Sequence, residues 1–367
     1  MAVTGVTFAV VLMFMQLGFL EAVKASATMI YDVLDFDIVI RSRDYDSFSD
    51  ARTFAKIRLS QAQSIRGVER ATPLLVGVFA WRNPQSGEPR AVLALGVPPG
   101  SEVFRDEAIQ AEVAAKIGQP EVILIDTKTR SEFGPKIGDS FGPADHGTHV
   151  EVNGKEVTIA GHFTRGAGMT AGGAMILSAR DFSACLPQLP AELVSLGLVR
   201  VEQGADVDEV ASRLAAELPG DVEVVTREKV LTSELRHWVW ETNYGLIFQS
   251  GVLVAVIVGT AVVYQVLASD VASLLPEYAT LKAMGYGNRH LVGVLLQQSI
   301  LLALFAYASG VLVSLLLYEI TARGAQIPIR MTGANLLVVF VLATALCVVS
   351  GIAAVRKTFH ADPADLF

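Results

Sequence analysis

The stretch TNYGLIFQSGVLVAVIVGTAVVYQVLAS, residues Thr242–Ser269, is strongly apolar and carries no charged side chain. Two further uncharged apolar stretches follow it, Leu291–Tyr318 and Met331–Val355, and a fourth, Met1–Leu20, opens the chain. An apolar run of roughly 20 residues crosses the ~30 Å hydrocarbon layer of a bilayer as a helix. A long, mostly polar segment separates the first run from the other three. The sequence therefore predicts an α-helical membrane protein with four transmembrane helices in a 1 + 3 arrangement.

Composition supports this class and excludes others. Hydrophobic residues make up 52 % of the chain, and the mean hydropathy is +0.46, both high for a soluble protein. The formal net charge of −8 lies in the polar insert, which has no basic stripe, so a nucleic-acid partner is not expected. Cys185 lies in the insert and Cys347 in the last apolar run, which argues against a disulfide between them.

The first apolar run has a second interpretation, a cleaved signal peptide. Met1–Leu20 has no basic n-region and no small-x-small cleavage site after a short apolar core. We therefore interpret it as a retained transmembrane helix.

Loop charges predict the orientation. The loop at 270–290 carries Lys282 and Arg289, and the end of the chain after Val355 carries Arg356 and Lys357. The loop between the last two spans, Glu319–Arg330, carries only Arg323 and Arg330. The positive-inside rule then places the N-terminus, the 270–290 loop and the C-terminus in the cytoplasm. The expected divisions are spans at 1–21, 244–269, 291–319 and 334–356, an extracytoplasmic domain at 22–243, a cytoplasmic loop at 270–290, a short extracytoplasmic loop at 320–333 and a cytoplasmic tail at 357–367.

The insert has the pattern of a mixed α/β domain. Predicted strands are Asp35–Arg41, Gly67–Val78 with a turn at Pro73, Ala91–Val97, Glu121–Asp126, Leu196–Val201 and Asp221–Thr226, and predicted helices are Asp50–Ser64, Ala108–Lys116 and Asp206–Leu218. Asn153-Gly154 lies between alternating apolar residues and predicts a type I′ hairpin. We expect two lobes with a boundary near Ala160–Arg180. Ala22–Leu34 and Arg227–Glu241 predict helices that continue from the first span and into the second as a stalk.

Motifs for metal or nucleotide chemistry are weak. His146 and His149 form an HxxH near His162, which permits a metal site, but the break at Gly147 favours a solvated loop. The glycine-rich segment Gly166–Gly173 has no phosphate-loop lysine, and no GxxxxGK[ST] is present, so it is interpreted as a flexible loop. We expect no catalytic residues, no metal and no cofactor in this chain.

The four apolar runs carry no charged side chain, which argues against a proton path through the membrane. Their small residues favour close helix packing, at Gly251, Gly259, Gly293, Gly310 and Gly351.

The cytoplasmic loop contains PEYATLKAMGYG, residues Pro276–Gly287. Pro276 and Glu277 suit the first turn of a short helix, and Gly285 suits its left-handed stop. As a bare pattern, a capped helix in a loop is unspecific.

This segment resembles the E-x-x-x-L-K/R-A-x-G element of FtsX/MacB-type ABC permeases. Within that superfamily the chain looks most like the DevC-type permeases, on five stretches: FAVVLMFMQLGFLEA (Phe8–Ala22), DFDIVI (Asp35–Ile40), VILIDTKTRSEFG (Val122–Gly134), AVVYQVLASDVASLLPEYATLKAMGY (Ala261–Tyr286) and ADPADLF (Ala361–Phe367). Members usually begin with a short cytoplasmic amphipathic segment, which leaves open whether Met1 is the true start.

The resemblance implies the membrane subunit of an ATP-driven exporter in the inner membrane, with its large domain in the periplasm. It implies a homodimer that works by mechanotransmission with a separate cytoplasmic ABC ATPase, which binds the ATP, and with a periplasmic membrane-fusion adaptor and an outer-membrane channel. The implied cargo is glycolipid or other hydrophobic envelope material. The residues expected to contact the ATPase are Glu277, Tyr278, Leu281, Lys282 and Gly285. Two other roles share this topology, an FtsX-like regulator of an envelope enzyme and a lipoprotein-release permease.

Overall fold

The computed structural model describes residues 2–165, 171–273, 284, 288–325 and 327–359. The chain divides into two compact units. The transmembrane unit comprises the residues before Lys24, Thr242–Ala325 and the residues from Ile329 onward, and the extramembrane unit comprises Lys24–Glu241 with 326–328.

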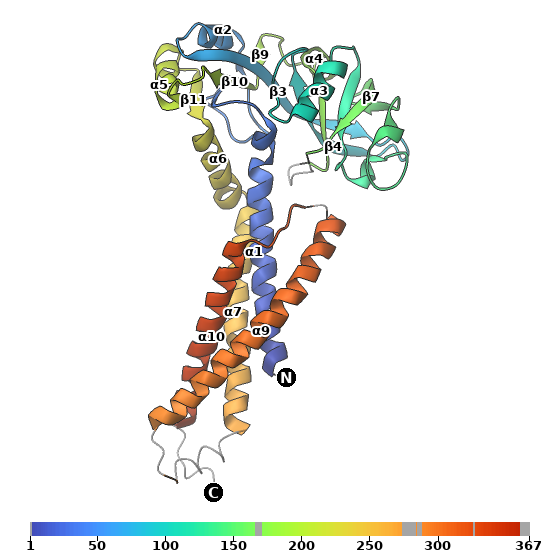
Figure 1. Ribbon diagram of the computed structural model, residues 1–367. Coiled ribbons are helices and arrows are strands. Elements are labelled where there is room, and N and C mark those ends of the chain that lie inside the picture. Colours follow the sequence, from blue (N-terminus) through green and yellow to red (C-terminus); the bar gives the residue numbers. More distant parts are fainter. Residues whose placement is uncertain (1, 166–170, 274–283, 285–287, 326, 360–367) are drawn as a thin grey trace. The chain divides into compact units, whose positions relative to one another are not determined.

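Four described helices are long and apolar enough to cross a membrane, which confirms the 1 + 3 arrangement. They are α1 (Ala2–Val33), α7 (Asn243–Ser273), α9 (Asn288–Ala325) and α10 (Gly333–Phe359). Helix α10 packs along both α7 and α9 (Figure 1). Helix α1 has no break over its 32 residues, so the predicted continuation beyond the first apolar run is confirmed. The limits of the membrane-crossing segments stay a prediction.

Small residues allow close approach between the helices of the transmembrane unit. A Cβ at Gly310 would lie 2.5 Å from Cγ1 of Val10 on α1, and a Cβ at Gly18 would overlap the ring of Tyr318. The Tyr318 hydroxyl donates a hydrogen bond to the Phe14 carbonyl on α1. Packing of this kind replaces the hydrophobic driving force, which is absent between helices in lipid.

The small-residue prediction holds at four of its five positions. A Cβ at Gly251 or Gly351 would also contact a neighbouring helix, at Gln16 and Ser299, and one at Gly259 would lie 3.3 Å from Ala9. A Cβ at Gly293 would meet open space, so the prediction that Gly293 allows close helix packing is wrong.

Nine strands of the described extramembrane unit form one sheet, in the order β11-β1-β10-β3-β4-β8-β5-β7-β6. They are β1 (Ile38–Ser42), β3 (Val68–Arg82), β4 (Pro89–Val97), β5 (Val122–Asp126), β6 (His149–Val152), β7 (Lys155–Phe163), β8 (Ala174–Ser178), β10 (Leu196–Val201) and β11 (Val222–Thr226). A small second sheet pairs β2 (Phe54–Ala55) with β9 (Leu193–Val194). Short helices cover the sheets: α2 (Ile57–Gln63), α3 (Glu107–Lys116), α4 (Ala179–Cys185), α5 (Val207–Glu217) and α6 (Arg227–Arg236).

Strand β3 is shared by two lobes. Its first half, Val68–Leu74, pairs with β10, and its second half, Leu75–Arg82, pairs with β4. The end of β3 also pairs with β6, which closes β3-β4-β8-β5-β7-β6 into a ring. The other lobe is the open sheet β11-β1-β10-β3. The last strand of the ring ends at Ser178, within the predicted boundary Ala160–Arg180. The ring is nevertheless inserted into the open sheet, so the prediction missed a second crossing inside β3.

Two local expectations also need correction. Strand β3 continues through Pro73, where a turn was predicted. The Leu74 carbonyl accepts a hydrogen bond from the Ser195 N–H on the β10 side, so the nitrogen of the preceding Pro73 faces the opposite side. Pairing with β4 on that side begins only at Leu75, so the missing N–H of Pro73 costs no hydrogen bond in the sheet. The helix predicted at Asp50–Ser64 is shorter, because α2 starts at Ile57 after strand β2.

Other elements follow their local signals. Asn153 and Gly154 have φ values of 47° and 77°, as the type I′ turn between β6 and β7 requires. Asp106 and Asp206 precede α3 and α5, and each side chain accepts hydrogen bonds from backbone N–H groups in the first turn. The helix predicted at Arg227–Glu241 is present as α6 followed by a π-helix, His237–Glu241.

Candidate functional site

The residues predicted to contact an ATPase lie outside the described part of the chain. Glu277, Tyr278, Leu281, Lys282 and Gly285 fall between α7, which ends at Ser273, and α9, which begins at Asn288. Their role stays a prediction. The site that the structure does describe is the junction at which α1 and α6 join the open sheet of the extramembrane unit.

Arg227 caps the C-terminal end of α1. Its guanidinium donates to the carbonyls of Tyr31 (2.6 Å) and Leu34 (3.2 Å) and stacks over the Phe36 ring at 4.7 Å. The last carbonyls of a helix have no partner within it, and a cation there also interacts favourably with the helix dipole. Arg227 is the first residue of α6, and its backbone N–H donates to Asp37 at 2.9 Å. One residue thus joins the end of α1, the start of α6 and the start of β1.

The Arg227 side chain is surrounded by charges of both signs. Burial lowers the pKa of its guanidinium, and the neighbouring Arg105 lowers it further, whereas Asp32, Asp37 and Asp35 raise it. Asp32 on α1 approaches the guanidinium to 4.0 Å. Because a guanidinium titrates far above neutral pH, the cap keeps its charge.

The segment between α1 and β1 is fixed by backbone hydrogen bonds. The Asp35 N–H donates to Val103 at 2.8 Å, and the Arg105 N–H donates to Val33 at 2.9 Å. The Asp35 carboxylate also forms an ion pair with Arg70 of β3. The end of α1 is therefore held on two sides, by α6 through Arg227 and by the loop before α3 through its backbone.

A buried carboxyl group connects α6 to α1. Glu234 is 1 % exposed, and its Oε1 accepts hydrogen bonds from Tyr31 of α1 (3.2 Å) and from Tyr45. The two tyrosine hydroxyls lie 2.7 Å apart, and the Arg41 guanidinium lies 4.4 Å from the centroid of the Tyr45 ring. Burial raises the pKa of the Glu234 carboxyl, while the hydrogen bonds from the tyrosines lower it. Burial also raises the pKa of Tyr45 well above its ordinary value, which keeps it a donor.

A π-helix separates α6 from α7. His237 Nδ1 and Glu241 Oε2 lie 3.1 Å apart across this turn. Trp238 is 9 % exposed and Trp240 63 % exposed, so the widened turn buries one indole and exposes the other. Single π turns are frequent at functional positions in helices.

The structure does not bring together the two histidines of the HxxH motif. His146 Nε2 lies 3.0 Å from His162 Nδ1, whereas His149 faces Glu156 at 3.5 Å. Burial and the charge of Lys116 lower the pKa of His146. Among the described residues, no group of three or more His, Cys, Asp or Glu side chains is arranged to hold a metal ion.

The described end of the glycine-rich segment is packed, which corrects the flexible-loop interpretation there. Gly172 accepts a hydrogen bond from Arg130 N–H and Gly173 one from Leu93 N–H, both at 3.0 Å. A Cβ at Gly173 would overlap Thr129. These glycines are required by close packing, and residues 166–170 lie outside the described part.

The junction is not apparent from the sequence. The polar stretch Arg227–Glu241 indicated a helix but not which of its charges is buried, and Glu234 looks like any solvated helix residue. The one available signal was the position of Arg227 directly after a predicted strand, where a long cation can reach the end of a neighbouring helix.

The structure defines a polytopic membrane protein with a mixed α/β domain inserted after its first membrane-crossing helix. Residues 1–217 match the MacB-like periplasmic core domain, and residues 250–363 match the FtsX-like permease C-terminal domain. The chain belongs to the MacB/FtsX-like family of ABC permeases. Permeases of this family are generally non-catalytic membrane subunits that work with ABC ATPase partners.

Three solved structures resemble the extramembrane unit weakly. The extracellular domain of the noncanonic ABC-type transporter YknZ from Gram-positive bacteria is 12 % identical, with a TM-score of 0.35, over 52 % of this chain and 99 % of that one. The periplasmic region of MacB from Actinobacillus actinomycetemcomitans is 10 % identical, with a TM-score of 0.37, over 56 % and 94 %. A domain of a putative permease protein from Porphyromonas gingivalis is 13 % identical, with a TM-score of 0.29, over 53 % and 87 %. These likenesses carry no functional conclusion, and no curated protein sequence matches the chain.

Proposed function

We propose that this chain is the membrane subunit of an ATP-driven exporter of the mechanotransmission type, similar to the DevC-type permeases. Two copies pair in the inner membrane with a separate cytoplasmic ATPase, which binds the ATP. A periplasmic adaptor and an outer-membrane channel complete the path for glycolipid or other hydrophobic envelope material. This chain catalyses nothing and holds no cofactor of its own.

The observation that carries the proposal is the way α1 is held along its length. The transmembrane unit holds it through Tyr318, which bonds to Phe14 and packs on Gly18. The extramembrane unit holds its last turn through the Arg227 cap and the Tyr31–Glu234 hydrogen bond. Because α1 is a single unbroken helix, we propose that a displacement imposed on its membrane-crossing part is passed along it to the open sheet.

The input to this movement is the loop between α7 and α9. In our proposal Glu277, Tyr278, Leu281, Lys282 and Gly285 contact the ATPase, and closure of the ATPase dimer displaces the helices that flank them. The substrate then need not pass between the apolar helices, which suits apolar runs without charged side chains.

The test is co-purification in neutral detergent followed by ATPase assays. We expect the wild-type chain to retain a cognate ABC ATPase and stimulate it, and Glu277→Arg and Leu281→Asp to lose both properties. Glu319→Arg is the matched control, because Glu319 is an exposed carboxylate at the opposite end of α9. Full stimulation and export by both loop variants would overturn the assigned contact. Co-elution of an envelope hydrolase in place of an adaptor would overturn the export role in favour of a regulator.

A further inference from the structure

Two histidines of the extramembrane unit bring their imidazole nitrogens together. His146 follows the short turn Pro143–Asp145, and His162 lies in β7. His146 Nε2 and His162 Nδ1 lie 3.0 Å apart, and the centroids of the two imidazoles are 5.2 Å apart. His149, the other member of the HxxH motif, lies 3.5 Å from Glu156 instead. The pair therefore arises from the tertiary fold and not from local spacing.

Backbone hydrogen bonds hold the turn before β6 against β7. The Gly147 N–H donates to the Ile159 carbonyl at 2.8 Å, and the Ile159 N–H donates to the Thr148 carbonyl at 2.9 Å. Gly147 has a φ of 77°, which glycine adopts without strain. His162 is fixed from the other side, because β7 pairs with β5 at Ile125. Nitrogen donors held in this way keep their spacing before a ligand arrives, which lowers the cost of binding it.

The separation of the two nitrogens is close to that of two donors on one metal ion. Zn²⁺ binds imidazole nitrogen at about 2.0–2.1 Å, so two donors at the tetrahedral angle lie about 3.3 Å apart. The observed 3.0 Å is close enough that a small rotation of either imidazole reaches this value. Without a metal, one imidazole must donate its N–H to the other.

The charges around the pair are compatible with a bound cation. Burial and the charge of Lys116 lower the pKa of His146, which keeps its imidazole in the neutral form that binds metals. The Lys116 ammonium is itself paired with Glu112 one turn earlier on α3, at 2.7 Å. Asp145 is 2 % exposed, and its carboxylate accepts the backbone N–H of Lys136 at 2.7 Å. The charged groups next to His146 therefore carry a net negative charge.

We propose that His146 and His162 bind a divalent transition-metal ion of the class that favours imidazole nitrogen, represented by Zn²⁺. The described residues contain no group of three or more His, Cys, Asp or Glu side chains placed around one ion, so water fills the remaining positions. His146 is exposed, which leaves these positions open to solvent. The ion joins the turn before β6 to β7. This inference differs from the sequence-based expectation of a chain without metal, and it does not depend on the exporter role.

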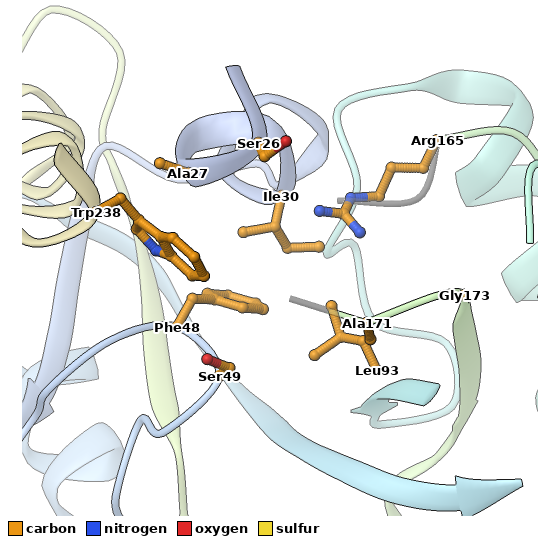
Figure 2. Close-up of a pocket in the computed structure, with 10 residues that line it drawn as sticks. All are labelled: Ser26, Ala27, Ile30, Phe48, Ser49, Leu93, Arg165, Ala171, Gly173 and Trp238. Atoms are coloured by element: carbon orange, nitrogen blue, oxygen red, sulfur yellow. The ribbon is translucent and has the colours of Figure 1, made fainter. Parts of the chain in front are cut away.

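The site lies on a strand that leads to the end of α1. Strand β7 ends at Phe163, and Arg165, two residues later, lines a cavity together with Ala27 and Ile30 of α1 (Figure 2). This cavity measures about 20 Å³, which is room for about one water molecule. An ion bound at His162 therefore restrains a strand whose exit lies beside α1.

The test is isothermal titration calorimetry on the full chain in neutral maltoside micelles, purified with a tag that contains no histidine. The titrants are zinc chloride and magnesium chloride at neutral pH. We expect saturable one-to-one binding of Zn²⁺ and no saturable binding of Mg²⁺, because Mg²⁺ prefers oxygen ligands. No saturable binding of Zn²⁺ would overturn the site. Mg²⁺ that binds as tightly as Zn²⁺ would overturn the imidazole ligands in favour of carboxylates.

Variants locate the ion. His146→Gln and His162→Gln should each weaken Zn²⁺ binding at least about tenfold, since losing even a residue that only supports a metal ligand costs about 10–100-fold. His149→Gln is the matched control, because that side chain is 67 % exposed and belongs to the HxxH motif. It should leave the affinity unchanged. An equal loss in His149→Gln would overturn the pair in favour of the motif, and unchanged affinity in His162→Gln would place the ion elsewhere.

Thermal unfolding provides a second measurement. An ion that binds only the folded state raises the melting temperature. Zn²⁺ should therefore raise the melting temperature of wild type and of His149→Gln, but not that of His146→Gln. Because His146 is exposed, His146→Gln should fold even if His162→Gln, within β7, folds poorly. A rise of the same size in His146→Gln as in wild type would overturn the proposed site.

Discussion

The chain enters and leaves its extramembrane unit through two helices of different construction. Helix α1 is α-helical without interruption to Val33, and its final carbonyls are capped by Arg227. The return path runs from α6 through the π-helix His237–Glu241 before α7 begins at Asn243. An unbroken capped helix transmits displacement, whereas a π turn is a place where helical register adjusts. The two connections therefore differ in helical type, since α1 is continuous and the return path changes from α-helix to π-helix.

The largest effect is expected at the cap. Arg227→Ala removes two charged hydrogen bonds to helix carbonyls and the stacking on Phe36, so we expect a loss of about 3 kcal/mol in the free energy of unfolding. Urea unfolding of the full chain in detergent, followed by tryptophan fluorescence, measures it. Arg43→Ala, at an exposed arginine, should change stability by less than about 0.5 kcal/mol. An Arg227→Ala protein as stable as wild type would show that the cap does not hold α1.

The next effect tests the part of α1 held in the transmembrane unit. Gly18→Val forces a side chain into the Tyr318 ring and should cost about 2 kcal/mol through overpacking. Gly324→Val is the control, because no atom lies within 4 Å of a Cβ built there. Thermal unfolding in detergent compares the two. Equal melting temperatures would contradict the close contact between α1 and α9.

A smaller, pH-dependent effect is expected at Glu234. Because burial raises the pKa of its carboxyl, the folded state binds more protons than the unfolded state above the ordinary carboxyl pKa. The contribution of Glu234 to stability is then largest at acid pH and falls as pH rises through the window between the unfolded and the raised folded pKa. Glu234→Gln should remove this fall, because the amide does not titrate.

The measurement is the free energy of unfolding of wild type and Glu234→Gln between pH 4 and pH 7. This range starts near the ordinary glutamate pKa of about 4.3. Glu228→Gln, an exposed carboxylate on the same helix, is the control. Identical pH profiles for wild type and Glu234→Gln would show that the carboxyl is not shifted by the fold.

The smallest effect is expected on the exposed side of the π-helix. Trp240→Ala should change stability by less than about 0.5 kcal/mol, because the indole is 63 % exposed, whereas Trp238→Ala should cost about 3 kcal/mol because that indole is buried. Circular dichroism melts of the two variants decide this. A large loss of stability in Trp240→Ala would mean that the exposed side of the π-helix also contributes to the fold.

Features that depend on neighbouring residues were predictable from the sequence. The apolar runs gave four membrane-crossing helices, and Asn153-Gly154 gave the hairpin between β6 and β7. Both signals act over a few residues, and tertiary contacts reinforce them rather than override them.

Features that depend on distant pairing were not predictable. Nothing in Val68–Arg82 shows that its halves serve different lobes, because the partners β10 and β4 are far apart from each other in the sequence. Burial of Glu234 is equally hidden, since it depends on tyrosines from two other segments. His146, which precedes β6, pairs with His162 of β7, where local spacing pointed to His149.

The insertion of one lobe within the other sets the order in which the extramembrane unit can assemble during synthesis. All strands of the ring have emerged by Ser178, but β1 pairs only with β10 and β11, which emerge later. Synthesis proceeds at about 5–20 residues per second, so both edges of β1 stay unpaired for several seconds while the strands of the ring are completed. Unpaired edges are templates for aggregation. Newly made chains therefore carry an unpaired β1 until β10 arrives, and its second edge stays open until β11 follows.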